Sequence, residues 1–184
     1  MTAPTLQGTT TRLRAVREDE VSQLTGWFND PDVNHWLHQS EREDAKAEDR
    51  LDVYIPAEDG SLLSLAIEGD GRLVGVIHLV GIDLTHGRAE LAIMIGDKSA
   101  WSRGYGADAM RTLLRHAFDE MGLRRVELIT DADNARGIRA YEKAGFVHEG
   151  RLRQHRLRYG TPIDMLVMSV LREEWTERVS PATV

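Results

Sequence analysis

A short run containing two glycines has the residue types of a phosphate site. Gly104 and Gly106 stand in Trp101-Ser-Arg-Gly-Tyr-Gly-Ala107, between a predicted strand and a predicted amphipathic helix. Glycines let the backbone approach a ligand closely and turn several N–H groups toward one point. The helix adds the positive end of its dipole, and Arg103 could add a charge-assisted contact. The run therefore predicts a phosphate or pyrophosphate site, with an ordinary glycine-containing turn as the alternative.

The same glycines also match the fingerprint of a dinucleotide-binding fold. Ala109 completes the pattern Gly-x-Gly-x-x-Ala, and Asp131 falls near the spacing of a ribose-binding acid. In that fold the glycine loop follows the first strand, whereas about 100 residues precede it here. Only about 80 residues follow, too few for the remaining parallel strands. The position of the loop argues against a dinucleotide fold.

A second segment with chemical potential runs from Asp133 to Phe146. Asn134 is suited to cap a helix that Gly145 closes, and Tyr141 lies two turns into that helix. Tyr141 lies on roughly the same helix face as Asn134. Taken alone, this segment is a capped helix with a half-buried tyrosine. Combined with the glycine run, it favours a ligand site.

Strands and helices must position both segments. Alternating polarity and β-branched residues predict strands over residues 12–17, 62–68, 73–82, 88–95, 126–129, 146–157 and 163–171. Apolar spacing and stop signals predict helices over residues 18–28, 33–38, 40–51, 104–121 and 134–144. Asp32 is the predicted cap of the second helix. Gly69-Asp70-Gly71 and residues 159–162 are predicted hairpin turns.

The order of these elements predicts an α+β fold in a single domain over residues 1–184. Its core would be a central mixed, mostly antiparallel sheet flanked by helices. In strand 88–95, Leu91 and Ile93 face one side of the sheet, and Glu90 faces the other. Residues 1–10 and 179–184 are expected to be flexible termini.

The composition excludes several classes of protein. There are 30 acidic residues against 23 Lys and Arg, a formal net charge of -7, which argues against a nucleic-acid binder and fits a cationic partner better. The absence of cysteine excludes disulfides, thiolate nucleophiles and Cys-ligated zinc. The N-terminal segment is polar, and no apolar run is long enough to span a bilayer. The protein is therefore expected to be soluble and cytoplasmic, without a membrane partner.

The two segments together resemble the GNAT superfamily, the Gcn5-related N-acetyltransferases. Its signature is (Gln/Arg)-x-x-Gly-x-(Gly/Ala), followed after a helix and a strand by Asn-x-x-(Ala/Gly)-x-x-x-Tyr-x-x-x-Gly-Phe. The positions that match are Gly104, Gly106, Asn134, Gly137, Tyr141, Gly145 and Phe146. Trp101 departs from Gln or Arg at the first position, as in the branch of ribosomal-protein and spermidine N-acetyltransferases. The resemblance covers most of the chain.

The resemblance implies acetyl-CoA as co-substrate and direct attack of an amine on the thioester. It implies that the backbone of Ile93, Met94 and Ile95 pairs with the pantetheine arm. It implies that the pyrophosphate is held by Ser102, Arg103, Gly104, Tyr105, Gly106 and Ala107. The residue matching Asn134 would bond the cofactor, and Tyr141 would protonate the departing thiolate. A phenol suits that role because its pKa, about 10, is near that of a thiol.

A base must also take a proton from the acceptor ammonium, and Glu90 is the candidate. The alternatives are that Glu90 is a structural carboxylate paired with Arg88 or Arg124, or that bulk water is the base. No metal is expected, because His35 and His38 lack a third ligand. The arginines of strand 146–157 and the residues after it could touch a phosphate or an acidic acceptor, but a salt-bridged strand face is favoured.

Three functions stay open. The acceptor is either a small amine such as a polyamine, or a protein N-terminus or lysine. The third possibility is a non-catalytic acyl-CoA-binding sensor, against which the presence of Tyr141 argues. The acidic segment 41–52 could attract a polyamine or a basic N-terminus, although a solvated helix face is favoured. A homodimer formed through the final strands is implied by family analogy alone.

Overall fold

A computed structural model of the chain describes residues 3–37 and 60–179, with side chains to residue 175. In this part of the chain one mixed sheet runs through the molecule in the order β1-β2-β3-β4-β5-β6-β8-β7. The strands are β1 Leu6–Gln7, β2 Thr11–Arg14, β3 Leu62–Gly69, β4 Arg72–Asp83, β5 Arg88–Ile95, β6 Arg125–Asp131, β7 Val147–Arg158 and β8 Thr161–Leu171. The helices are α1 Val21–Asn29, α2 Pro31–Asn34, α4 Tyr105–Arg115, α5 Ala135–Ala144 and α6 Arg172–Val179.

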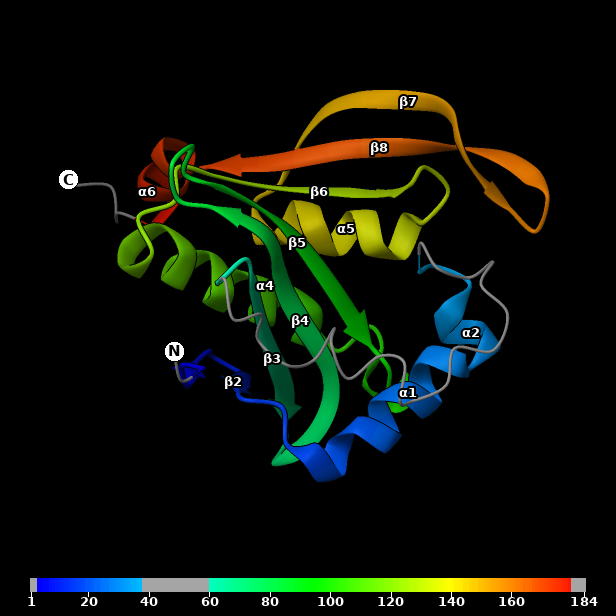
Figure 1. Ribbon diagram of the computed structural model, residues 1–184, viewed down its shortest axis with the longest axis horizontal. Helices are drawn as coiled ribbons and strands as arrows, with labels where there is room; N and C mark the ends of the chain where they lie inside the picture. Colours follow the sequence, from blue (N-terminus) through cyan, green and yellow to red (C-terminus); the bar gives the residue numbers. More distant parts are fainter. Residues whose placement is uncertain (1–2, 38–59, 180–184) are drawn as a thin grey trace.

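The sheet is antiparallel except where β5 pairs with β6. That parallel pair joins two antiparallel halves, strands β1 to β5 and the group of β6 with the β7–β8 hairpin (Figure 1). The predicted α+β fold with a mixed, mostly antiparallel sheet is confirmed. Because a single parallel pair is present in the described sheet, a dinucleotide fold is excluded, as the position of the glycine loop indicated.

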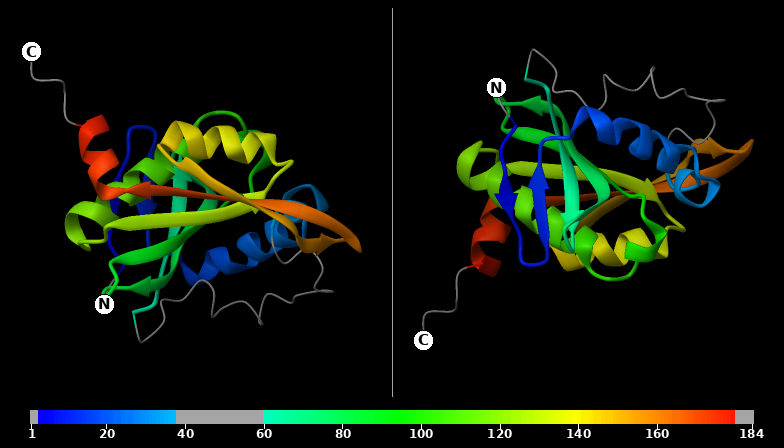
Figure 2. Two further views of the ribbon diagram at one scale, coloured as in Figure 1. Left: turned by 90° about the horizontal axis from the view of Figure 1, so that it is seen from above. Right: turned by 90° about the horizontal axis from the view of Figure 1, so that it is seen from below.

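Helices cover both faces of the sheet, and Figure 2 shows α1 and α5 on opposite sides of it. On the α4 face, Leu65 and Ile67 of β3 belong to one buried cluster with Met110 and Leu113. Alternate residues of the strands point the other way into a smaller cluster built around α1. Both faces of the central strands are therefore buried, which explains their nearly continuous apolar sequence.

Three predicted boundaries differ from the structure. The first strand ends at Arg14, because Arg17 N–H bonds Glu20 Oε2 at 2.9 Å and opens a 3₁₀ turn instead. The second helix begins at Pro31, and its cap is Asp30 rather than Asp32, because Asp30 Oδ1 accepts the Asp32 N–H at 3.0 Å. Pro fits the first helical position because its missing N–H needs no partner there.

The sequence did not predict α6, but the other predicted helices and turns in the described residues agree closely with the structure. The apolar stripe of helix 104–121 lies on α4 and on the π-helical turn His116–Glu120 that continues it, and Gly122 ends it with φ 72°. The turn Asp70-Gly71 has positive φ at both residues, as a tight hairpin requires. The last hairpin turns at Tyr159-Gly160, two residues tighter than predicted, because Thr161 already pairs with Arg158.

Residues 6–11 of the N-terminal segment are held by strand pairing and hydrogen bonds. Leu6 and Gln7 form β1, and the turn after it is held by Asp108 of α4. Asp108 Oδ2 accepts the N–H groups of Thr10 and Thr11 at 2.8 and 2.9 Å and the Thr11 hydroxyl at 2.8 Å. Residues 1–10 were expected to be flexible. The sequence did not indicate these hydrogen bonds, because Thr10 and Asp108 are almost 100 positions apart.

Burial alone would raise the pKa of Asp108, which is 4% exposed. The hydrogen bonds from Thr9, Thr10 and Thr11 outweigh burial and lower the pKa from 3.8 to about 2. The ionised carboxylate therefore fastens the N-terminal hairpin to the first turn of α4.

Several expectations fall outside the described residues. They are the helix at residues 40–51, residue 38 of the second helix and the terminus after residue 179. The second helix itself ends earlier than predicted, at Asn34, and a turn follows it. None of the helices in residues 3–37 and 60–179 is long and apolar enough to cross a membrane.

Asp108→Asn is expected to lower the free energy of unfolding by about 2–3 kcal/mol, because an amide nitrogen would face the donors of the N-terminal turn. In the wild type the lowered pKa stabilises the fold above pH 3.8, and this contribution is lost as the pH falls toward about 2. The loss is about 2 kcal/mol. Urea unfolding of the wild type and of Asp108→Asn, at pH values from 3.8 down to about 2, measures this loss of stability.

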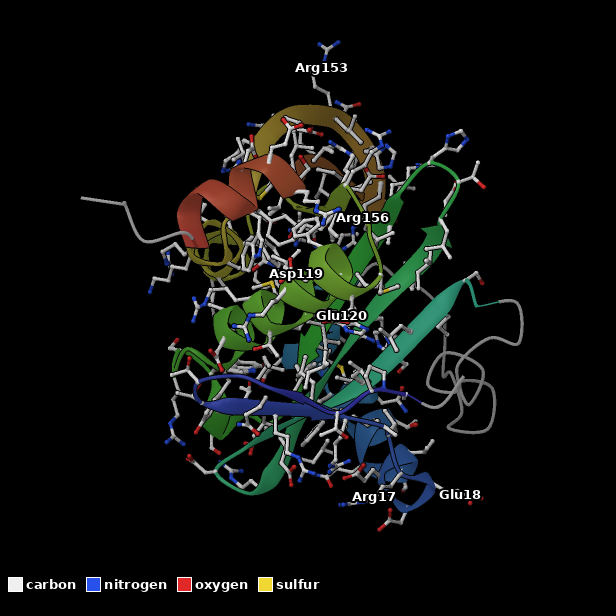
Figure 3. All side chains as sticks on the ribbon, turned by 90° about the vertical axis from the view of Figure 1, so that its left-hand side faces the viewer. Arg17, Glu18, Asp119, Glu120, Arg153 and Arg156 are labelled. Carbon is white, nitrogen blue, oxygen red and sulfur yellow. The ribbon has the colours of Figure 1, made fainter. Side chains whose placement is uncertain are left out.

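The control is Asp119→Asn, an exposed acid on the helical turn after α4 (Figure 3). It should leave both the stability and its pH dependence unchanged. A wild type and an Asp108→Asn variant with parallel pH dependence would contradict the assignment.

Candidate functional site

The site lies where β5 and β6 part. The two strands pair only from Arg88–Arg125 to Glu90–Glu127, after which β5 runs on with β4 and β6 with β8 (Figure 1). A cavity of about 290 Å³ lies beside the last residues of β5. Its lining is Val33, Trp36, Leu37, Ile93, Met94, Ile95, Ala100, Trp101, Ser102, Gly104, Tyr105, Gly106, Ala107, Met110, Asn134, Arg136, Gly137, Arg139, Ala140, Tyr141 and Lys143.

The cavity reaches both faces of the sheet. Ile93 and Ile95 pack against the α4 cluster, whereas Met94 and Val33 belong to the α1 cluster. One end is formed by α4 and α5, and the other by α2 with its C-terminal turn. A ligand lying in this cavity could therefore be approached by a second molecule from the opposite face.

One end of the cavity is the N-terminus of α4. Gly104 is the residue before the helix and has φ 89°, a left-handed conformation that favours glycine. The N–H groups of the first helical turn have no partner within the helix, and they carry the positive end of its dipole. A Cβ on Gly106 would lie 3.7 Å from Ile95 Cγ1, on the cavity wall, so its absence leaves room for a ligand to approach the backbone there. This end suits an anion.

Two residues of the glycine run tie it to the sheet. Arg103 Nη2 lies 3.0 Å from Asp70 Oδ2, and the Tyr105 hydroxyl donates to the same oxygen at 2.6 Å. Asp70 stands in the β3–β4 turn, so this turn fixes the loop from outside. Tyr105 lines the cavity, but Arg103 does not. The structure thus brings all the predicted cofactor contacts together except Arg103.

Asn134 lines the cavity as the cap of α5. Its Oδ1 accepts the Gly137 N–H at 3.0 Å, and its Nδ2 donates to Thr130 Oγ1 at 3.3 Å. A Cβ on Gly137 would lie 2.5 Å from Asn134 Nδ2, so the glycine leaves the space that the cap needs. The predicted cap is confirmed.

Tyr141 lies on the same wall of the cavity and is half-buried. Its ring meets Phe146 edge-on, with centroids 6.2 Å apart. Loss of solvent raises the pKa of Tyr141, and the Thr130 hydroxyl opposes that rise. The phenol therefore keeps its proton at neutral pH and can donate it.

Glu90 does not line the cavity; it lies at the point where the strands part. It is half-buried and faces away from the α4 cluster, beside Glu127 of β6. Burial, and then repulsion by Glu127, raise its pKa. Arg88 lies 3.8 Å from Glu127 and Arg124 donates to a backbone carbonyl, so neither forms the ion pair with Glu90 that was the alternative.

Sequence reasoning missed a group of basic residues that line the cavity. Arg136, Arg139 and Lys143 stand three and four residues apart on α5, so they share one helix face at the anion end. That spacing was a usable signal. Trp36 and Leu37 line the opposite end, which the fold builds from α2 and its C-terminal turn.

The arginines of β7 form the salt-bridged face that the sequence favoured. Arg156 and Arg158 lie 2.9 and 3.2 Å from the buried Asp131, and Arg151 pairs with Asp164. Arg153 points away from the molecule (Figure 3). Within the described ranges, no three His, Cys, Asp or Glu side chains gather as a metal site.

Asn134→Ala is expected to lower the free energy of unfolding by about 1 kcal/mol, since it removes the cap. Gly137→Ala should also destabilise the wild type, because its Cβ displaces the Asn134 amide. In the Asn134→Ala background the same change should stabilise by up to about 1 kcal/mol, because alanine is the better helix former. Denaturant unfolding of the four proteins tests this sign reversal; an equal effect in both backgrounds would refute the steric account.

The chain matches a family model described as the acetyltransferase (GNAT) domain over residues 11–147. A Bacillus licheniformis protein named uncharacterized N-acetyltransferase p20 is 24% identical over 168 residues, 89% of this chain and 93% of that one. Spermidine N(1)-acetyltransferase of Escherichia coli (strain K12) is 28% identical over 142 residues, 77% of this chain and 75% of the relative.

Among solved structures, a spermidine N-acetyltransferase from Vibrio cholerae in complex with CoA and spermine shares the fold, with a TM-score of 0.82 at 20% identity. The likeness covers 91% of this chain and 99% of that one.

Proposed function

The chain belongs to the GNAT acetyltransferase domain family and is an acetyl-CoA-dependent N-acetyltransferase; from that premise we propose which residues carry the reaction and which amine accepts the acetyl group. The observation that carries the proposal is the cavity at the parting of β5 and β6, which reaches both faces of the sheet. The donor lies on the α4 and α5 side, and the acceptor enters from the α2 side.

The residues of the cavity fit acetyl-CoA. The exposed backbone edge of Ile93 to Ile95 can pair with the amides of a pantetheine arm, because β6 has left β5 at this point. The N–H groups around Gly104 to Ala107 can hold the pyrophosphate, with α5 cations beside them. When bound, acetyl-CoA supplies an acetyl group activated as a thioester.

Tyr141 is the proposed general acid. It reaches the cavity from α5, on the donor side, and its raised pKa keeps the hydroxyl protonated. Its Oη donates a proton to the departing sulfur, so that a neutral thiol leaves.

Glu90 is the proposed base. Its carboxylate faces the α1 side of the sheet, away from Leu91 and the α4 cluster. The proposed acid and base thus stand on opposite faces of the sheet, on the donor side and the acceptor side of the cavity. Glu90 takes a proton from the acceptor ammonium, directly or through one water, and its raised pKa makes it a stronger base than an exposed glutamate.

We propose a polyamine as the acceptor. The relatives named spermidine N-acetyltransferase support this, together with the net charge of -7 and the Glu90–Glu127 pair on the acceptor face. A protein N-terminus remains an outcome of the test below. The expected homodimer stays a prediction; β7 provides the edge of the described sheet that such a contact would need.

The acceptor is tested by thiol release from acetyl-CoA with spermidine, spermine, single amino acids and short basic peptides. Spermidine or spermine should be acetylated, and Tyr141→Phe should lower kcat by about 100-fold or more while binding acetyl-CoA as before. Transfer to peptides alone would replace the polyamine with a protein acceptor. No transfer, despite a rise in Tm with acetyl-CoA, would favour the sensor.

Glu90→Gln is expected to lower kcat/KM for the amine by about 10- to 100-fold at neutral pH. In the wild type kcat/KM should rise with pH as Glu90 ionises, and the variant should lack this rise. Tm should not fall, because the change removes a charge that burial and Glu127 disfavour. The exposed Glu120→Gln is the matched control (Figure 3). An unchanged pH–rate profile would make bulk water the base.

A further inference from the structure

Arg136 is placed unusually for an arginine in this molecule. It stands in the first turn of α5 and is half-buried, and its Cζ lies 3.7 Å from the centroid of the Trp101 ring. Trp101 is itself fixed, because its indole N–H donates to the Ile95 carbonyl at 2.7 Å. The end of β5 therefore holds the ring, and the ring holds the guanidinium.

Among the described residues Arg136 has no carboxylate partner, in contrast to the other shielded arginines. Arg14 pairs with Glu20 at 2.6 Å, and Arg125 pairs with Glu149 at 2.6 Å. In residues 3–37 and 60–175, stacking on Trp101 is the one contact that Arg136 makes with a polar or aromatic group. Burial without an anion lowers its pKa. The site thus holds a partly desolvated positive charge that no carboxylate of the described residues neutralises.

The stack leaves the hydrogen-bonding edge of Arg136 open. A guanidinium is planar and carries five N–H donors around its rim, so a ring against one face does not occupy them. Arg136 lines the cavity at the end where Ser102 and Gly104 lie, together with Arg139 and Lys143. A planar donor set beside free helix N–H groups matches a phosphate.

We propose that Arg136 binds a phosphate group of the acyl donor and that Trp101 is the residue that positions it. The inference rests on the proposed function, since it takes acetyl-CoA as the ligand of this cavity. Arg103, the charged residue of the glycine run, is held by Asp70 outside the cavity, so the cation comes from α5 instead.

The test uses donors that differ in their phosphates: acetyl-CoA, acetyl-dephospho-CoA without the 3′-phosphate, and S-acetylpantetheine without any phosphate. Arg136→Met keeps the length of the side chain and removes its charge. It should raise KM for acetyl-CoA by about 10- to 100-fold, leave kcat within about twofold and leave KM for S-acetylpantetheine unchanged. An effect that persists with acetyl-dephospho-CoA assigns the contact to the pyrophosphate; one that disappears assigns it to the 3′-phosphate.

Trp101→Leu removes the ring and should raise KM for acetyl-CoA in the same way. The double variant should be little worse than either single one, because both remove one unit. Arg115→Met, an exposed arginine on α4, is the matched control and should change neither constant. Arg136→Met should retain the wild-type Tm, because Arg136 has no ion pair to lose.

Two results would overturn the inference: an equal rise in KM for all three donors, or a rise in KM for the amine alone. Calorimetric titration with CoA distinguishes failure of the inference about Arg136 from failure of the proposed function. If the wild type binds CoA but acetylates no amine, the affinity of Arg136→Met for CoA still decides the role of Arg136.

Discussion

The parting of β5 and β6 after three residue pairs is the constraint on which the site depends. If the two strands stayed paired, the sheet would be continuous, and its two faces would be separated by backbone. Their separation requires that each strand be held from its other side, β5 by β4 and β6 by β8. The long antiparallel pairings of the two halves thus make possible a gap in the middle of the sheet.

Two carboxylates hold the helix and loop that close one end of this gap. Asp70, in the β3–β4 turn, binds Arg103 and Tyr105. Asp108 accepts hydrogen bonds from N–H groups of the N-terminal hairpin. Both acids have a lowered pKa, because hydrogen-bond donors surround their ionised forms. The glycine loop and the N-terminus of α4 form the anion end of the cavity. Two carboxylates that do not line the cavity therefore hold this end in place.

Local patterns predicted much of the fold and part of the site. The stripe on α4, the cap at Asn134 and the turn at Asp70-Gly71 each depend on residues within a few positions, and each is found. The gathering of Gly104 and Tyr141 in one cavity followed from the resemblance rather than from spacing. The roles of Tyr141 and Glu90 remain predictions.

What the sequence could not indicate depends on distant contacts or on competition between neighbours. The anchoring of the N-terminal turn joins residues almost 100 positions apart. Asp30 and Asp32 are both good caps, and Pro31 at the first helical position decides between them. The aromatic end of the cavity depends on where α2 packs, which no periodicity specifies.

The wall formed by α2 has a consequence for the order in which the site is built during synthesis. Arg156 pairs with the buried Asp131 and donates to the Leu37 carbonyl, a contact across 119 positions, and Arg158 lies over the Trp36 ring. A ribosome makes α2 before it makes the β7–β8 hairpin, whose arginines contact the end of the cavity that α2 forms. Because non-local contacts form only when both partners exist, a nascent chain without β7 has the glycine loop and no finished acceptor end. The contacts that hold Trp36 and Leu37 at this end of the cavity therefore form only after the β7–β8 hairpin has been made.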